Sequence, residues 1–131
     1  MMKNNLQLVD RNGNATQQPK KKIYIAGKVT GEDLAVCTMK FGTVQRSIEA
    51  LGFEVINPME LIQNKNTHWQ VAMRICIMKL MTCHGIFVLR DHIDSRGATI
   101  EFQLAKDLDM PHFRNINELK KAKWNKPVPT P

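Results

Sequence analysis

A glutamate stands where an amphipathic helix is expected to bury an apolar side chain. The inward-facing stripe expected after residue 97 reads Ala98, Glu101, Leu104, Ala105 and Leu108. An unpaired buried carboxylate costs several kcal/mol, whereas a helix N-terminus returns only about 0.3–1 kcal/mol. We therefore interpret Glu101 as a functional carboxylate, a side chain that can act as a nucleophile. The alternative is a solvated glutamate on a slightly rotated helix.

The segment before this helix has the features of a ligand-binding turn. Residues 85–89 form a short apolar run of strand-forming residues that leads into a polar turn, residues 90–94. Ser95 is a good N-cap, Gly97 allows backbone to approach a ligand, and the first free N–H groups form an anion site. Glu101 is about 9 Å further along the helix axis, but its side chain tilts back toward the helix start. One small ligand could contact both Ser95 and Glu101.

Secondary-structure patterns alternate along the chain. We expect strands at 22–26, 53–56, 85–89 and 111–113, and helices at 34–51, 69–80 and 95–108. This alternation predicts an α/β fold, a three-layer, doubly wound parallel sheet of four to five strands, flavodoxin-like or Rossmann-like. We expect residues 1–21 to be a disordered basic extension, residues 22–119 the folded domain, and residues 120–131 a tail rich in proline and lysine.

The positive charge is concentrated at the two ends of the sequence. Residues 1–22 and residues 114–131 each carry a net charge of +4, and residues 23–113 carry −1, in accord with the overall +7. We interpret the two basic segments as solvated flanks, so we expect no nucleic-acid partner.

The cysteine count and the hydropathy pattern restrict the location of the protein. Three cysteines in apolar stretches indicate reduced, mostly buried thiols. The histidines and cysteines lack metal-ligand spacing, so we expect neither a metal nor another cofactor. No apolar leader and no stretch long enough to span a membrane is visible. We therefore expect a cytoplasmic protein.

Two polar loops should meet at one edge of the predicted sheet. Ligands bind such sheets beyond the carboxyl ends of the strands, where the strand order reverses, usually between the first and third strands. The loops that follow those strands are residues 27–31 and 90–97. Lys28, Thr30 and Gly31 are candidates to contact a phosphate or a sugar hydroxyl. The alternative is a flexible turn in which Thr30 is the N-cap and Asp33 completes a capping pair.

Three motifs carry a family resemblance. Residues 23–27 (IYIAG), residues 52–58 (GFEVINP), and residues 95–98 (SRGA) with Glu101 together resemble the nucleoside 2-deoxyribosyltransferase-like superfamily. More narrowly, they look like its small phage- and bacteria-borne branch of unassigned function. The resemblance covers about residues 22–113.

The resemblance implies roles for individual residues. Glu101 corresponds to the nucleophile that attacks the anomeric carbon of a nucleoside or nucleotide, and Ser95 to the ligand of a 5′-phosphate. The other substrate-binding residues implied lie in the same two strands and loops: Tyr24, Gly27, Lys28, Thr30, Gly31, Arg96 and Gly97. A carboxylate can trap an oxocarbenium-like centre as a glycosyl ester, which water or a second base then resolves.

The leaving base also requires a proton donor. Relatives commonly supply aspartates from positions that Cys76 and His84 occupy here. Asp91, Asp94 or His92 in the turn are the available substitutes. Two functions therefore stay open: cleavage or transfer of the N-glycosidic bond of a (deoxy)nucleoside or its 5′-monophosphate, or a catalytically degenerate module that binds or senses a nucleotide.

The resemblance and the apolar pattern of residues 69–81 also predict self-association. Relatives complete their pockets from a neighbouring subunit. Four apolar positions lie outside the expected core stripe of this helix: Val71, Ile75, Met78 and Met81. We expect a homodimer or larger assembly with this helix at the interface.

Overall fold

A computed structural model describes residues 11–13 and 19–124. The disordered extension expected over residues 1–21 and the tail expected over residues 120–131 fall mostly outside these described residues. The described chain forms a four-stranded, all-parallel sheet in the order β2-β1-β3-β4. Its strands are β1 (Lys22–Ala26), β2 (Glu54–Ile56), β3 (Gly85–Val88) and β4 (His112–Phe113). The predicted doubly wound parallel α/β fold is confirmed.

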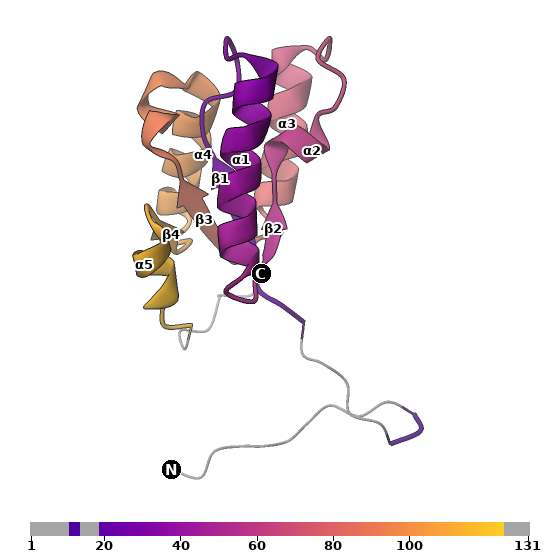
Figure 1. The fold of residues 1–131 in the computed structure, drawn as a ribbon, viewed down its shortest axis with the longest axis vertical. Helices are drawn as coiled ribbons and strands as arrows, with labels where there is room; N and C mark the ends of the chain where they lie inside the picture. The colour runs from indigo at the N-terminus through magenta and orange to yellow at the C-terminus, as the bar shows by residue number, and fades with distance from the viewer. Residues whose placement is uncertain (1–10, 14–18, 125–131) are drawn as a thin grey trace.

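Helices cover both faces of the sheet (Figure 1). They are α1 (Leu34–Glu49), α2 (Pro58–Leu61), α3 (Trp69–Leu80), α4 (Arg96–Asp107) and α5 (Ile116–Lys120), with a 3₁₀ helix, η1 (Arg90–Asp94). The sequence pattern predicted neither α2 nor α5. Asn57 accepts a hydrogen bond from the Met59 amide and so caps α2, with Pro58 in the first turn.

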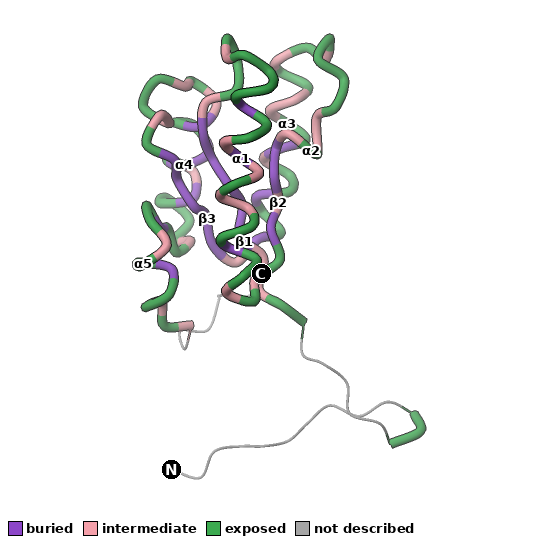
Figure 2. The backbone as a smooth tube through the Cα atoms, in the orientation of Figure 1, coloured by how far each residue is buried: buried purple, intermediate pink, exposed green. Residues whose placement is uncertain are grey.

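The sheet divides the core into two clusters, one on each face. Ile23 and Ile25 of β1 face α1 and α5, where Phe41 and Leu119 are fully buried. Tyr24 and Ala26 point to the opposite face, where α3 and α4 contribute most of the second cluster: Cys76, Leu80, Ala98, Phe102 and Ala105. Figure 2 shows the strands as the most continuously buried part of the chain. Tyr24 thus places a phenol inside the layer formed with α3 and α4.

Helix phase is the main correction to the expected core. Leu108, expected inside, is 56% exposed, whereas Phe102 is only 5% exposed. α4 is rotated so that Phe102 joins Ala98, Glu101 and Ala105 on the buried side. Because successive residues of a helix differ by about 100°, a small rotation exchanges residues at the margin of the stripe and leaves its centre in place.

The predicted adjacency of the two loops is also observed. β1 and β3 pair in parallel from Ile23 opposite Gly85 to Ala26 opposite Val88, so the following turns leave the sheet side by side. At that edge, a Cβ on Gly27 would lie 2.6 Å from Cδ1 of Leu89, so a larger residue here would have to displace the Leu89 side chain. Among the described residues, no helix has the length and apolar character needed to cross a membrane.

Candidate active site

Glu101 lies on the buried side of α4 and is held by one phenol. The Tyr24 hydroxyl donates a hydrogen bond of 2.6 Å to Glu101 Oε2. Tyr24 has no exposed surface, and Glu101 is 5% exposed. Oε1 forms no hydrogen bond to the described residues, among which no fully buried polar side-chain atom lacks a partner. Oε1 therefore retains contact with solvent.

Burial dominates the electrostatics of this pair. It raises the pKa of Glu101 to about 7, although the hydrogen bond from Tyr24 acts in the opposite direction. Burial, and next the negative charge of Glu101, raises the pKa of Tyr24 far above its ordinary value. The phenol thus stays protonated, whereas the carboxyl group changes charge near neutral pH.

A thiol completes the surroundings of the phenol. Cys76 of α3 is 6% exposed and interacts with the Tyr24 side chain. Burial raises the pKa of the Cys76 thiol to about 11, so it is neutral at physiological pH. All three cysteines are free and buried, as predicted. Three neutral or neutralisable groups from β1, α3 and α4 therefore meet between the sheet and its helices.

The turn before α4 is organised as an N-cap. Ser95 Oγ accepts a hydrogen bond of 3.1 Å from the Ala98 amide, as predicted for the residue that starts this helix. The guanidinium of Arg96 lies 4.4 Å from the centre of the Trp69 ring, which belongs to the first turn of α3. A Cβ on Gly97 would lie 2.8 Å from Met73 Sδ, so α3 lies directly against the start of α4. Packing between these helices accounts for this glycine.

An ion-pair network ties the two loops together. Asp91 accepts hydrogen bonds from the Lys28 amide and from Lys40 Nζ, and Lys40 also binds the Lys28 carbonyl and Glu32. Burial alone would raise the pKa of Asp91, but the hydrogen bonds from Lys40 and the Lys28 amide outweigh it and hold the pKa below its ordinary value. Asp91 is therefore an ionised link between the loops. Lys40 lies on α1 outside every motif, so the sequence did not indicate its contact with Asp91.

The other expected loop residues are more exposed. Thr30 is exposed in the turn after β1, and Gly31 has a φ of +82°, a conformation that favours glycine. The alternative in which Thr30 caps the following helix is wrong, because Asp33 is the N-cap and accepts from the Val36 amide. Asp94 is exposed, whereas His92 Nδ1 lies 2.8 Å from the Leu89 carbonyl and its ring packs edge-on against Phe102.

His84 lies at the other edge of the sheet. Its Nδ1 accepts a hydrogen bond of 2.9 Å from the Lys22 amide at the start of β1. Burial, followed by the charges of Lys21 and Lys22, lowers the pKa of His84. This histidine therefore fixes the amino ends of two strands and is separated from the loops that follow β1 and β3.

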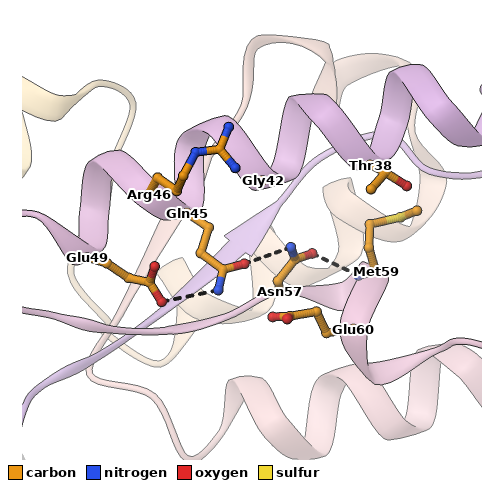
Figure 3. A pocket seen from close by; sticks show the side chains of 8 residues that line it. All are labelled: Thr38, Gly42, Gln45, Arg46, Glu49, Asn57, Met59 and Glu60. Carbon is orange, nitrogen blue, oxygen red and sulfur yellow. Dashed lines mark hydrogen bonds between the residues drawn. The ribbon is translucent and has the colours of Figure 1, made fainter.

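Two surface hollows lie away from Glu101. One, of about 350 Å³, opens between α1 and α2 and is lined by Thr38, Gly42, Gln45, Arg46, Glu49, Asn57, Met59 and Glu60 (Figure 3). There the Asn57 amide donates to Gln45 Oε1, and Gln45 in turn donates to Glu49. The other, about 450 Å³, is a shallow depression on the outer side of α4. Among the described residues, no cluster of His, Cys, Asp and Glu could hold a metal ion.

The chain belongs to the family described as Domain of unknown function (DUF4406), which matches residues 21–113. That range extends from the start of β1 to the end of β4 and contains Tyr24, Glu101 and both loops. A search of curated proteins finds no match.

A solved structure has the same fold. It is that of a 2-deoxyribosyltransferase from the psychrotolerant bacterium Bacillus psychrosaccharolyticus, which matches with a TM-score of 0.55 and 14% sequence identity. The match covers 79% of this chain and 93% of that chain. At this identity, the similarity establishes a nucleoside deoxyribosyltransferase-like fold.

Proposed function

We propose that this DUF4406 protein cleaves or transfers the N-glycosidic bond of a (deoxy)nucleoside or its 5′-monophosphate, with Glu101 as the nucleophile. The observation that carries the proposal is the buried Tyr24–Glu101 pair beside the turn that starts α4. A stable fold has no need of a carboxyl group whose pKa burial raises to about 7. The fold shared with a 2-deoxyribosyltransferase supports a nucleoside substrate. We also propose that the chain belongs to the small phage and bacterial branch of the nucleoside 2-deoxyribosyltransferase-like superfamily.

The proposed reaction uses the two carboxylate oxygens differently. Tyr24 holds Oε2, and Oε1, which contacts solvent, forms a bond to the anomeric carbon as the C–N bond breaks. The electron pair of the broken C–N bond leaves with the base, and the base takes up a proton. Water then cleaves the glycosyl ester and gives hydrolysis, or a second base displaces the carboxylate and gives transfer.

The loops supply the proposed substrate contacts. Ser95, Arg96 and Gly97 at the start of α4 would bind a 5′-phosphate through the hydroxyl, the guanidinium and free backbone N–H groups. The loop after β1 would face the sugar; its proposed contacts are Gly27, Lys28, Thr30 and Gly31. We propose Tyr24 as the residue that orients Glu101 beneath the sugar.

Two carboxylates of the turn receive different proposed roles. Asp94 is exposed, so it is the candidate that can deliver a proton to the leaving base. Asp91 is held ionised by Lys40 and the Lys28 amide, and we propose that it positions the two loops.

The assembly we propose is a homodimer or larger. The outer face of α3 exposes four large apolar side chains: Val71 (46%), Ile75 (37%), Met78 (71%) and Met81 (41%). Burial of this face against a second copy would remove it from water and bring a neighbouring surface toward the site. Light scattering of the protein at tens of micromolar should give at least twice the 15.0 kDa chain mass, and a Met78→Lys substitution should lower it.

Release of free base tests the reaction. The purified chain is incubated with nucleosides and with their 5′-monophosphates, with or without a second free base, and the products are separated by chromatography. Hydrolysis gives free base alone, and transfer gives a new nucleoside. Glu101→Gln should abolish turnover and leave nucleotide affinity nearly intact, whereas Glu60→Gln, which changes an exposed carboxylate on α2, should change neither. Full turnover by the Glu101→Gln variant would show that Glu101 is not the nucleophile.

A binding module is the second candidate function, favoured by Cys76. The neutral thiol stands beside Tyr24 at a position where relatives commonly carry an aspartate. In that case, no substrate is turned over, but Ser95→Ala still weakens the binding of monophosphates by roughly 1–3 kcal/mol and hardly affects that of nucleosides. Buried free thiols suit a reducing compartment, so we place either activity in the cytoplasm.

A further inference from the structure

The fold brings together the described parts of the two basic segments, residues 19–22 and 114–124. Lys21 Nζ lies 5.6 Å from the centre of the Trp124 ring. That ring packs 5.9 Å from Phe53 and 5.7 Å from Phe113, so the segment after α5 is fixed against the start of the sheet. The start of β1 and the end of α5 both lie toward the lower end of the molecule in Figure 1, and the turns after β1 and β3 lie at the upper end.

We call this region the basic end and define it by its six lysines. Three precede or begin β1, and three lie at the end of α5 or just after it: Lys20, Lys21, Lys22, Lys120, Lys121 and Lys123. From the sequence alone these are two separate flanks. The contact between Lys21 and Trp124 makes them one surface.

Most of this charge is uncompensated within the described residues. Glu54 pairs with Lys22 at 3.8 Å, and the Glu118 carboxylate accepts a hydrogen bond from the Arg114 amide. Among the described residues, no carboxylate lies within 4.0 Å of the amino group of any other lysine of the basic end. The lowered pKa of His84, to which Lys21 and Lys22 contribute after burial, is consistent with a positive potential here.

The basic end exposes charged side chains but no large apolar ones. In residues 19–22 and 116–124, no large hydrophobic side chain is exposed, and Ile116 and Trp124 are half-buried. Binding to a lipid surface typically adds apolar side chains to the charge, whereas phosphate backbones are bound by lysine charge alone.

We propose that the basic end binds nucleic acid through its phosphate backbone, without sequence preference. The described basic end offers little aromatic surface for base stacking, because Trp124 is half-buried and packs against Phe53, Phe113 and Lys21. Contact is therefore electrostatic and falls steeply with salt. This surface is independent of Glu101, so the proposal does not rest on the proposed glycosidic activity.

Fluorescence anisotropy with a fluorescein-labelled 20-base-pair DNA tests the proposal on the full chain. Neutralisation of three phosphates should weaken binding about 40-fold between 50 and 200 mM salt, and each further phosphate should steepen this dependence. A DNA of different sequence should give the same curve.

Two triple variants, matched in the charge they remove, and one double variant locate the surface. Lys120→Ala/Lys121→Ala/Lys123→Ala should weaken binding roughly tenfold or more. The pair Lys20→Ala/Lys21→Ala, at the other end of the sequence, should also weaken it. Lys65→Ala/Arg74→Ala/Lys106→Ala removes the same charge away from the basic end and should have a much smaller effect. Circular dichroism verifies that each variant is folded.

Three results would overturn the proposal: no anisotropy change at 50 mM salt, equal weakening by the two triple variants, or binding to phosphatidylserine vesicles in the absence of DNA binding. The last result would assign the basic end to a lipid surface.

Discussion

The two faces of the sheet differ in the polarity of the side chains buried against them. On the face covered by α1 and α5, the buried residues of the cluster are all apolar, with Phe41 and Ile48 fully enclosed. On the face covered by α3 and α4, a phenol and a carboxyl group lie among the apolar residues. Both faces use the same strands, so the backbone does not impose the difference. Both layers bury an apolar cluster, and only the layer with α3 and α4 also buries a carboxyl group whose burial raises its pKa, an arrangement that lowers stability.

Buried polar groups elsewhere support this contrast. Asn57 is 6% exposed, and its side chain is uncharged. Its amide nitrogen donates a hydrogen bond to Gln45 and its amide oxygen accepts one from the Met59 amide, so both polar atoms have a partner. Glu101 has a single donor and a raised pKa. The first arrangement satisfies the hydrogen bonds of a buried polar residue, and the second agrees with the role of nucleophile that we propose for Glu101.

The largest effect is expected on the apolar face. Phe41→Ala should lower the free energy of unfolding by about 3–5 kcal/mol, because it removes a fully buried ring and leaves a cavity. Urea unfolding should give the same loss near pH 5 and near pH 8. Lys40 Nζ lies 5.4 Å from the centre of the ring, and Cys37 belongs to the same cluster, but the pKa values of both groups are raised, so neither changes charge between these pH values. A loss that varies strongly with pH would mean that the two faces are coupled.

Glu101→Gln is expected to stabilise the protein, but only at high pH. Burial raises the pKa of Glu101 from 4.5 to about 7 in the folded state, so the penalty for its charge is absent below pH 4.5 and complete above pH 7. Near pH 8 the variant should therefore be more stable than the wild type, on the order of 3 kcal/mol, and near pH 4.5 about equal to it. If urea unfolding gave the variant and the wild type equal stabilities at both pH values, the result would contradict the burial of a charged Glu101.

Tyr24→Phe removes the donor and keeps the ring. The hydrogen bond lowers the pKa of Glu101, so its loss should raise that pKa above 7. We expect a loss of stability of about 1.5–3 kcal/mol at pH 8, where a charged acceptor loses its partner, and about 0.5–1.5 kcal/mol at pH 5. If the proposed reaction occurs, the acidic limb of its pH–rate profile should move to higher pH. An unchanged limb would mean that Tyr24 does not act on Glu101.

The smallest effects come from a pair of glycines in helices. Gly97→Ala would place a Cβ 2.8 Å from the flexible Met73 side chain and should destabilise by about 1 kcal/mol. Gly42→Ala meets only the Arg46 guanidinium, at 3.5 Å, and should stabilise by about 0.5–1 kcal/mol. Thermal unfolding distinguishes the signs. Opposite signs would show that α3 and α4 are packed tightly at the site and that the hollow beside α1 has room to spare.

The sequence was sufficient for the elements that are long and amphipathic. The period of α1, α3 and α4, the N-cap at Ser95 and the reversal of strand order between β1 and β3 were all predictable, because they depend on local spacing and on a general rule of parallel sheets. α2 and α5 have four and five residues, too few for a period to be visible.

The partner of Glu101 was beyond what local patterns show. β1 is buried on both faces, so its sequence does not alternate, and nothing indicates which side Tyr24 takes. Lys40 was missed for a similar reason: a lysine on a helix reads as solvated until the fold brings it to Asp91. Both contacts depend on tertiary geometry between residues that are distant in sequence.

The central position of β1 has a consequence for synthesis. This strand emerges from the ribosome before both of its partners, because Ile23 pairs with Val55 on one side and Gly85 on the other. The Tyr24 hydroxyl finds Glu101 only after 77 further residues. A nascent chain therefore exposes an apolar strand that chaperones can recognise, but it lacks the paired carboxylate until α4 docks. The site can therefore form only after α4 has been synthesised and has docked against β1, and a chain truncated before Glu101 lacks it.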